Sequence, residues 1–174
     1  MGILSLLLWT PAFGAVLLIF LRTENAFVIR NVARFIALLT VIFSCLVMMR
    51  VNPAQASPQL LEFSFLFPGS GNSYTLGVDG ISLPMLLLAT LLTLVALLAS
   101  DSITTGIKSY HISILALEFG MLGVFLAQQW TLFFIFWELT LVPLYFLIDR
   151  WGGKRRHAAS LNFVLYTMGG SVFM

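Results

Sequence analysis

The sequence predicts an all-α integral membrane protein with about six transmembrane helices and a short β-hairpin outside the membrane. Two observations lead to this prediction. Hydrophobic residues make up 60% of the 174 residues and charged residues only 9%, whereas a soluble domain carries about 25% charged residues. The apolar residues also fall in runs that approach the ~20 residues a helix needs to cross a bilayer.

Six apolar runs account for the predicted helices, and polar or turn-forming residues separate them. The first run has no basic residue before it, unlike a signal peptide, so we interpret it as a retained helix that Pro11 kinks. Ser82 and Pro84 are residue types that suit the first turn of a helix. Residues 1–51 are therefore assigned to transmembrane helices 1 and 2, and residues 81–174 to helices 3 to 6. The predicted spans are Ile3–Leu21, Val32–Val51, Ile81–Ser100, His111–Ala127, Trp130–Ile148 and Ala158–Met174.

Residues 52–80 form the longest stretch outside these runs and are predicted to be an extracytoplasmic loop that holds the β-hairpin. Leu61–Phe67 alternates at period two, and Tyr74–Val78 reads as a second short strand. Turn-forming residues lie between them, at Pro68–Ser73. We expect a structural role for this hairpin, either sealing helix ends or touching a neighbouring protein.

The basic residues predict the orientation of the chain in the membrane. Cytoplasmic loops are enriched in Lys and Arg. Of the nine Lys and Arg residues, only Arg50 follows the second or fourth run. The N-terminus is therefore expected outside, with the basic loops in the cytoplasm or its equivalent. The other eight follow the first, third and fifth runs: Arg22, Arg30, Arg34, Lys108, Arg150, Lys154, Arg155 and Arg156.

Glu138 is the residue that most strongly indicates a function. It precedes Asp149 by about 16 Å of helix, which places it near the middle of a ~30 Å hydrocarbon layer. A charged acid at that depth costs roughly 3 kcal/mol on insertion scales, so it is paired, faces a wet cavity, or is held neutral. All three conditions suit an acid that carries a proton. The alternative is a structural acid satisfied by a neighbouring helix. No Lys lies deep in any span, so a cationic partner has to come from elsewhere.

Three further residues are predicted to support Glu138. Pro143 cannot donate a hydrogen bond to the carbonyl of Leu139, which leaves that oxygen free to hold a water beside the acid; the alternative is a plain kink. Glu118 lies ~10 Å deep in the fourth span and is predicted as a second proton-carrying acid, between Glu138 and the cytoplasmic side. The alternative is an acid that binds a nearby helix or reaches the interface. His111 is interpreted first as interfacial, like His157, and second as a supporting proton donor.

No cofactor or metal site is expected in this chain. Cys45 is the single cysteine, and the two histidines make no metal-ligand signature. The sequence contains neither a phosphate-binding loop nor a nucleotide fingerprint nor a Ser/His/Asp set, so we expect no redox catalysis by this chain itself. The Gly169–Ser171 segment is interpreted as a close helix contact. Lys154–Arg156 is interpreted as a topology signal, with binding of lipid headgroups or a partner protein as the second option.

Five segments together resemble the antiporter-like membrane subunits of complex I, of the type called subunit M, or subunit 4 in mitochondria, which has counterparts in chloroplasts and cyanobacteria. The resemblance is specific in the Trp-Glu-Leu-x-Leu-Val-Pro run around Glu138 and the Trp-Gly-Gly that follows it. It covers residues 77–174 well and the N-terminal third loosely. The segments are Phe134–Ile148, Trp151–Gly153, Asn162–Ser171, Gly77–Ser82 and Leu117–Phe125.

The resemblance implies a fold and an activity. Members of the family have about fourteen transmembrane helices with two inverted five-helix repeats, and the glutamate matching Glu138 pairs with a lysine on the seventh helix. Quinone reduction elsewhere in the complex, with NADH or ferredoxin as donor and iron–sulfur clusters as carriers, drives proton pumping. The partners are the other membrane subunits, including antiporter-like neighbours, and a hydrophilic redox arm. The membrane is an energy-transducing one, either a bacterial inner membrane or a thylakoid.

The resemblance therefore predicts a proton-translocating subunit of a complex I type oxidoreductase. Because the sequence ends in the sixth helix, we expect an N-terminal fragment that lacks the paired lysine and does not pump alone. The alternatives are a subunit of a multi-subunit Na⁺/H⁺ antiporter or of a membrane-bound hydrogenase, and a non-functional truncated fragment. Val142–Tyr145 favours the oxidoreductase.

Overall fold

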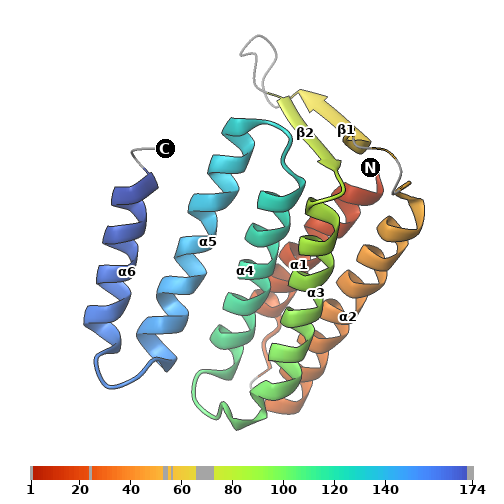
Figure 1. The fold of residues 1–174 in the computed structure, drawn as a ribbon. Helices are drawn as coiled ribbons and strands as arrows, with labels where there is room; N and C mark the ends of the chain where they lie inside the picture. Colours follow the sequence, from red (N-terminus) through yellow and green to blue (C-terminus); the bar gives the residue numbers. More distant parts are fainter. Residues whose placement is uncertain (1, 24, 53–54, 56, 66–72, 172–174) are drawn as a thin grey trace.

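Helices and one β-hairpin make up the described part of the chain in the computed structural model (Figure 1). The structure describes residues 2–23, 25–52, 55, 57–65 and 73–171. In chain order the elements are α1 (Ile3–Phe20), α2 (Ala26–Arg50), β1 (Gln59–Phe65), β2 (Ser73–Val78), α3 (Ser82–Ala99), the 3-10 turn η1 (Ser100–Ser102), α4 (Ile107–Leu126), α5 (Trp130–Trp151) and α6 (Arg156–Ser171).

Among the described residues, five helices are long and apolar enough to cross a membrane: α1, α2, α3 together with η1, α4 and α5. The described part of α6 is shorter, at 16 residues. Hydrocarbon offers no partner for backbone N–H and C=O groups, so apolar segments of this length fold as helices that satisfy their own backbone. The predicted fold class, an all-α membrane protein with a small hairpin, is confirmed.

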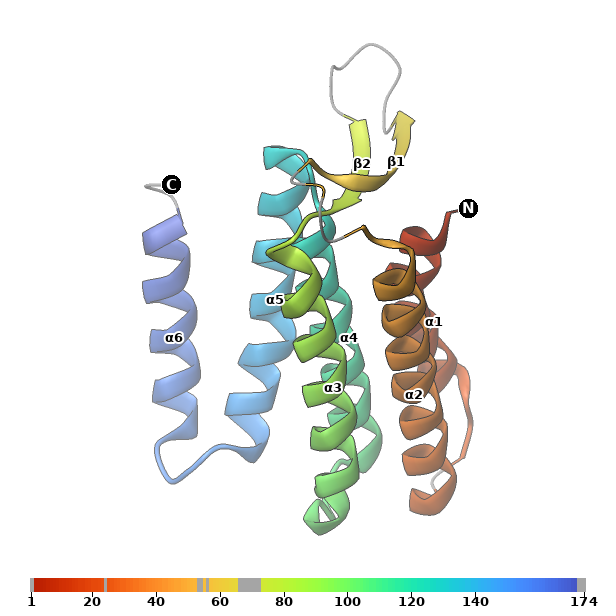
Figure 2. The ribbon, with the colours of Figure 1, turned by 45° about the vertical axis from the view of Figure 1, so that its right-hand side comes forward.

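Helix α4 lies at the centre of the arrangement. Helices α1, α2 and α3 pack against it, and α2 also packs against both α1 and α3. Helix α5 packs along the remaining side of α4. Helix α6 packs along α5, so that α5 and α6 extend as a row from the four-helix group (Figure 2). Large apolar side chains on this row face away from the chain's own core, for example Leu165 at 69% exposure and Tyr166 at 80%. These faces are suited to lipid or to another membrane protein.

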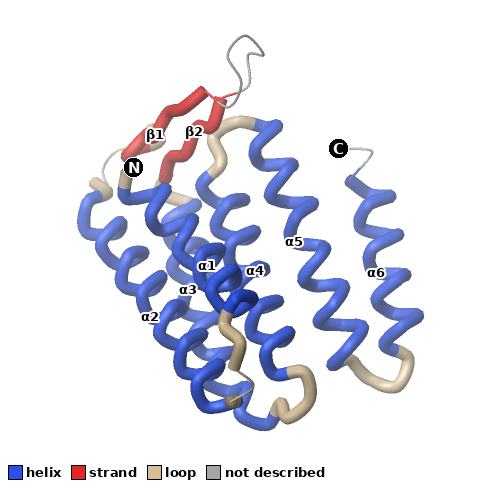
Figure 3. The backbone as a smooth tube through the Cα atoms, turned by 180° about the vertical axis from the view of Figure 1, so that it is seen from behind, coloured by secondary structure: helices blue, strands red, loops and turns tan. Residues whose placement is uncertain are grey.

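The two ends of the bundle differ in character (Figure 3). The N-terminus and the hairpin lie at one end, which we call the hairpin end. The connections α1–α2, α3–α4 and α5–α6 lie at the other, which we call the basic end because Arg22, Lys108 and Lys154 lie there. The positive-inside rule assigns the basic end to the cytoplasm or its equivalent.

Two helices begin a full turn or more before their predicted starts. Helix α2 begins at Ala26 rather than Val32, because Asn25 caps it: its side-chain oxygen accepts a backbone amide of the first turn at 3.0 Å. Helix α4 begins at Ile107 rather than His111, one turn earlier. Polar residues in these first turns are typical of loops, but here they contact neighbouring connections. Arg30 of α2 binds carbonyl oxygens of the α3–α4 connection, and Lys108 of α4 binds those at the end of α1.

The hairpin is antiparallel, with Glu62 opposite Leu76 and Phe63 opposite Thr75. An irregularity in the pairing lies between Gln59 and Glu62, where Leu60 has a positive φ of 54°. The predicted turn at Pro68–Ser73 lies outside the described residues apart from Ser73 at the start of β2.

Glu62 connects the hairpin to the start of α1. Its carboxylate accepts hydrogen bonds from the Leu4 amide at 2.6 Å, the Ser5 amide at 3.0 Å and the Ser5 hydroxyl at 2.5 Å. The first amides of a helix have no partner within the helix, and a negative charge there is favourable. The hairpin therefore supplies the cap that Gly2, at the N-cap position, lacks.

Candidate functional site

Two glycines of α4 let α5 approach closely. A Cβ at Gly123 would lie 2.1 Å from the ring of Phe136, and one at Gly120 would lie 2.7 Å from Cγ2 of Thr140. These two contacts give the antiparallel register of the pair. The register places Glu138 of α5 beside the stretch of α4 between the two glycines.

Glu138 lies in a groove between α5 and α6. Its side chain is half-buried, and the groove has a volume of about 530 Å³. Apart from the carboxylate, the lining is apolar or aromatic, contributed by Leu141, Val142, Tyr145, Phe146, Val164 and Met168. The acid therefore faces a space large enough for water or for a side chain of another helix.

Ser171 of α6 holds the Glu138 carboxylate. Its hydroxyl lies 2.6 Å from Glu138 Oε1 and 3.0 Å from the Met168 carbonyl oxygen. A hydroxyl has a single hydrogen, while a carbonyl oxygen and an ionised carboxylate only accept. The contact is satisfied with Glu138 ionised, when Ser171 donates to it, and with Glu138 protonated, when the acid donates to Ser171. Ser171 was interpreted only as a small packing residue, so this contact was missed.

Glu118 is fully buried and faces α2. Its Oε1 lies 2.8 Å from the Thr40 hydroxyl, and its Oε2 has no hydrogen-bond partner among the described residues. The register of α4 and α5 puts Glu138 roughly one turn closer to the hairpin end than Glu118. The two acids thus lie at neighbouring depths, but their partners are on different helices, α2 for Glu118 and α6 for Glu138. These contacts therefore provide no direct proton transfer between Glu138 and Glu118.

Pro143 lies inside α5, five residues after Glu138, as the predicted span places it, and it is buried. Proline has no N–H, so the carbonyl of Leu139 receives no hydrogen bond from it. That carbonyl belongs to the residue next to Glu138. A water held there remains a prediction.

The two histidines differ in their surroundings. His111 is fully buried near the start of α4, with Nδ1 at 2.7 Å from the Ile107 carbonyl oxygen. Its position at the membrane interface stays a prediction. The His157 side chain is 74% exposed and lies 2.5 Å from the Asp149 carboxylate, as expected of a residue at a helix end.

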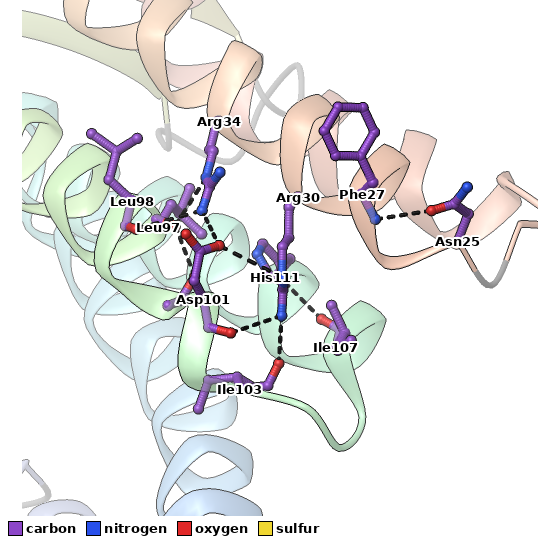
Figure 4. Close-up of polar contacts among 11 residues, drawn as sticks. Asn25, Phe27, Arg30, Arg34, Leu97, Leu98, Asp101, Ile103, Ile107 and His111 are labelled. Atoms are coloured by element: carbon purple, nitrogen blue, oxygen red, sulfur yellow. Dashed lines mark hydrogen bonds and ion pairs between the residues drawn. The ribbon is translucent and has the colours of Figure 1, made fainter.

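Close to His111, at the basic end, two arginines of α2 bind the α3–α4 connection (Figure 4). Arg34 lies 2.5 Å from the Asp101 carboxylate, and Arg30 lies 3.8 Å from it. Arg30 also donates to the Asp101 and Ile103 carbonyl oxygens, at 3.0 and 2.9 Å. Both arginines had been counted only as topology signals.

Buried hydroxyl groups inside α2 and α3 were also missed. Thr40 binds Glu118, and Ser44 one turn further lies 3.1 Å from the Thr90 hydroxyl. Thr93 is buried on the same face of α3. A spacing of three or four residues between hydroxyls within an apolar span was the available signal, since polar side chains in membranes bind between helices.

No cluster of three or more His, Cys, Asp or Glu that could hold a metal ion occurs within the described residues. Cys45 is exposed on α2. The polar groups of the site are carboxyl, hydroxyl and imidazole groups, which exchange protons and do not transfer electrons.

The chain is similar to known membrane proteins over most of its length. A family described as NADH:quinone oxidoreductase/Mrp antiporter, TM, matches residues 127–174. NAD(P)H-quinone oxidoreductase chain 4 of Prochlorococcus marinus is 35% identical over 173 residues, which cover 98% of this chain and 32% of that protein. The chloroplastic chain 4 of Mesostigma viride is 36% identical over 165 residues, covering 94% and 32%. The chain 4 1 protein of Picosynechococcus sp. is 47% identical over 116 residues, covering 67% and 22%.

The chain belongs to the antiporter-like membrane family of NADH:quinone oxidoreductases and Mrp antiporters. The family match includes all of α5 and α6, and hence Glu138 and Ser171. This antiporter-like chain spans about a third or less of the length of the relatives it matches. It is a multi-pass membrane protein, as its composition predicted.

Proposed function

We propose that this antiporter-like chain is part of the proton-translocating membrane machinery of a complex I type oxidoreductase, which acts between NAD(P)H or ferredoxin and a quinone. The names of its relatives support the reaction class. The observation that carries the proton-transfer role is the position of Glu138, a carboxyl group inside a transmembrane helix that lines a groove of about 530 Å³. Ionisable groups inside membranes are expensive and mark ion or proton paths.

The contacts of Glu138 suit an acid that changes its protonation state. The Ser171 hydroxyl accommodates both forms, and the apolar lining of the groove limits other partners. Pro143 frees a carbonyl beside the acid. A cation that approached the groove from another helix of the complex would favour the ionised form, and its withdrawal would favour the protonated form. The resemblance implies a lysine in this role.

Glu118 and His111 complete the proposed set. Glu118 is a second proton-carrying acid, buried beside Thr40, and His111 is a supporting group at the basic end of the same helix.

The remaining chemistry belongs to other subunits. Quinone, iron–sulfur clusters and NADH or ferredoxin would bind outside this chain. The partners are the other membrane subunits of the complex, with antiporter-like neighbours among them, in an energy-transducing membrane of the bacterial inner-membrane or thylakoid kind. The exposed apolar faces of α5 and α6 provide surface for them.

A Na⁺/H⁺ antiporter subunit is the second candidate, because the description of the matching family names Mrp antiporters as well. The two functions differ in what accompanies the chain. Co-purification with iron–sulfur subunits supports the oxidoreductase, and sodium-dependent proton exchange without them supports the antiporter.

Glu138→Gln tests the proposal in the assembled complex in its native membrane. Glutamine keeps the shape of the side chain but cannot carry the proton, and a positioned acid contributes roughly 10²–10⁴-fold to proton transfer. We expect coupled proton uptake to fall at least about tenfold, with a normal amount of assembled complex. Ser171→Ala is the matched control: it removes the hydrogen bond but keeps the acid, and uptake falls less. Unchanged uptake with normal assembly in Glu138→Gln would instead indicate a structural acid or a non-functional chain.

A further inference from the structure

Helix α4 carries two buried polar side chains on one face. His111 lies near the basic end, and Glu118 lies two turns deeper, about 10 Å along the helix axis. Both are fully buried. Each has one polar atom without a hydrogen-bond partner among the described residues: Nε2 of His111 and Oε2 of Glu118. Leaving a buried polar atom in that state is costly, so two of them in line on one helix require an explanation.

The other atoms of these side chains show which positions can exchange a proton. His111 Nδ1 lies 2.7 Å from the Ile107 carbonyl oxygen, which only accepts, so Nδ1 carries the hydrogen and Nε2 of the neutral ring is an acceptor. The Thr40 hydroxyl lies 2.7 Å from the Ala37 carbonyl oxygen and 2.8 Å from Glu118 Oε1. Its single hydrogen goes to Glu118 when the acid is ionised. When it goes to the carbonyl, a protonated Glu118 donates to Thr40. The contact accommodates both states of the acid.

The ion cluster at the basic end joins α2 to the α3–α4 connection, next to the start of α4. In Figure 4, His111 lies beside Arg30, whose guanidinium binds carbonyl oxygens of the α3–α4 connection. Arg34 binds the Asp101 carboxylate, and the Asp101 side chain is 63% exposed. The cluster therefore reaches the surrounding solution on one side and His111 on the other.

Between His111 and Glu118 the same region is apolar. The hydrogen bond from Arg34 to the Leu97 carbonyl oxygen, at 3.2 Å, lies on its basic side, and the contact of Thr40 with Glu118 lies on its hairpin side. Two of the buried residues that α2 contributes there are alanines, the smallest side chains in the cluster. We call these four residues the apolar belt: Ala33 and Ala37 of α2, Leu97 of α3 and Leu115 of α4.

We propose that α2, α3 and α4 enclose a proton-uptake path from the basic end to Glu118, with His111 as its outer relay and the apolar belt as a gate that water crosses transiently. This inference rests on the proposed function, in which Glu118 carries a proton. A proton from the basic end binds His111 Nε2, and the same N–H bond breaks when the proton passes to water in the belt. Nδ1 keeps its hydrogen on Ile107. The water then protonates Glu118 Oε2, so no further reactant is required.

Infrared measurement of hydrogen–deuterium exchange at the Glu118 carboxyl tests this path, in the assembled complex in native membranes. Glu118→Gln assigns the band. Ala37→Val adds volume to the apolar belt and leaves the His111 and Glu118 side chains in place. We expect exchange to slow about tenfold, as a barrier higher by ~1.4 kcal/mol gives. Ala89→Val is the matched control, because Ala89 lies next to Thr90, on the hairpin side of Glu118 and outside the apolar belt. We expect this variant to exchange at the wild-type rate.

Two further variants keep the test decisive if Ala37→Val does not assemble. Leu115→Ala widens the belt and is expected to speed exchange. His111→Gln removes the relay and is expected to slow both the exchange and proton uptake. Exchange rates unchanged in all variants that assemble would overturn the path. The proposed function is tested separately, by Glu138→Gln. If the exchange rates stay unchanged while Glu138→Gln still lowers proton uptake, the uptake path is wrong and the proposed function stands.

Discussion

Gly123→Ala perturbs the contact that holds α4 and α5, and with them both membrane-embedded acids. The added Cβ would lie 2.1, 2.2 and 2.6 Å from three atoms of the Phe136 ring. Phe136 is 5% exposed and packs edge-on against Phe119 at 5.4 Å, so its ring has little room to turn away. Either the ring leaves its position or the two helices separate.

The expected cost follows from two opposing terms. Inserting a methyl group into a packed core costs about 1–3 kcal/mol. Replacing a glycine inside a helix by alanine returns about 0.5–1 kcal/mol. Because the added Cβ would overlap the ring at 2.1 Å, the cost lies in the upper part of its range, at about 2–3 kcal/mol. Gly123→Ala is therefore expected to lower the free energy of unfolding by roughly 1–2.5 kcal/mol.

Thermal unfolding of the purified protein in nanodiscs measures this change. The double variant Gly123→Ala/Phe136→Leu, compared with both single variants, isolates the coupling between the two positions. We expect the smaller side chain to recover part of the loss. Gly153→Ala is the control, because a Cβ at Gly153 meets nothing within 4 Å. A neutral or stabilising Gly123→Ala, or a strictly additive double variant, would refute the close contact of α4 with α5.

Two other predictions concern caps at the hairpin end. Glu62→Gln weakens the three hydrogen bonds at the start of α1, so the Leu4 and Ser5 amides are expected to exchange hydrogen faster; unchanged protection would contradict the cap. The Ser82 amide donates a hydrogen bond to the Asp79 carboxylate at 2.7 Å, which holds the pKa of Asp79 below its ordinary value of 3.8. A depressed folded-state pKa adds stability that is present above about pH 3.8 and is lost as the pH falls through the folded value. Asp79→Asn is expected to keep the cap and to remove this loss of stability at low pH. The unfolding temperature measured as a function of pH tests this. An unfolding temperature that falls at low pH as much in Asp79→Asn as in the wild type would contradict it.

The sequence predicted the elements that follow from length and hydropathy. The helices that cross the bilayer, the hairpin at residues 59–78 and the position of Glu138 inside a span all follow from runs of apolar residues, period-two alternation and a lone carboxylate. These patterns are local, so they can be read without knowing which helices touch.

What depends on contacts between helices was not predicted. The contact of Thr40 with Glu118 depends on how α2 packs against α4. The contact of Ser171 with Glu138 depends on how α6 packs against α5. No single run of residues specifies such packing. The burial of His111 likewise depends on the packing of α4 against its neighbours. The role of each acid in proton transfer stays a prediction until it is measured.

Infrared difference spectroscopy of the assembled complex, with the band of Glu138 assigned by Glu138→Gln, most directly tests whether this acid exchanges a proton within the membrane. A carboxyl signal that appears and disappears as the complex turns over is the expected result, since the groove beside α6 and the Ser171 hydroxyl accept both protonation states. A carboxyl group that gives no difference signal in any turnover state, in an otherwise active complex, would contradict it.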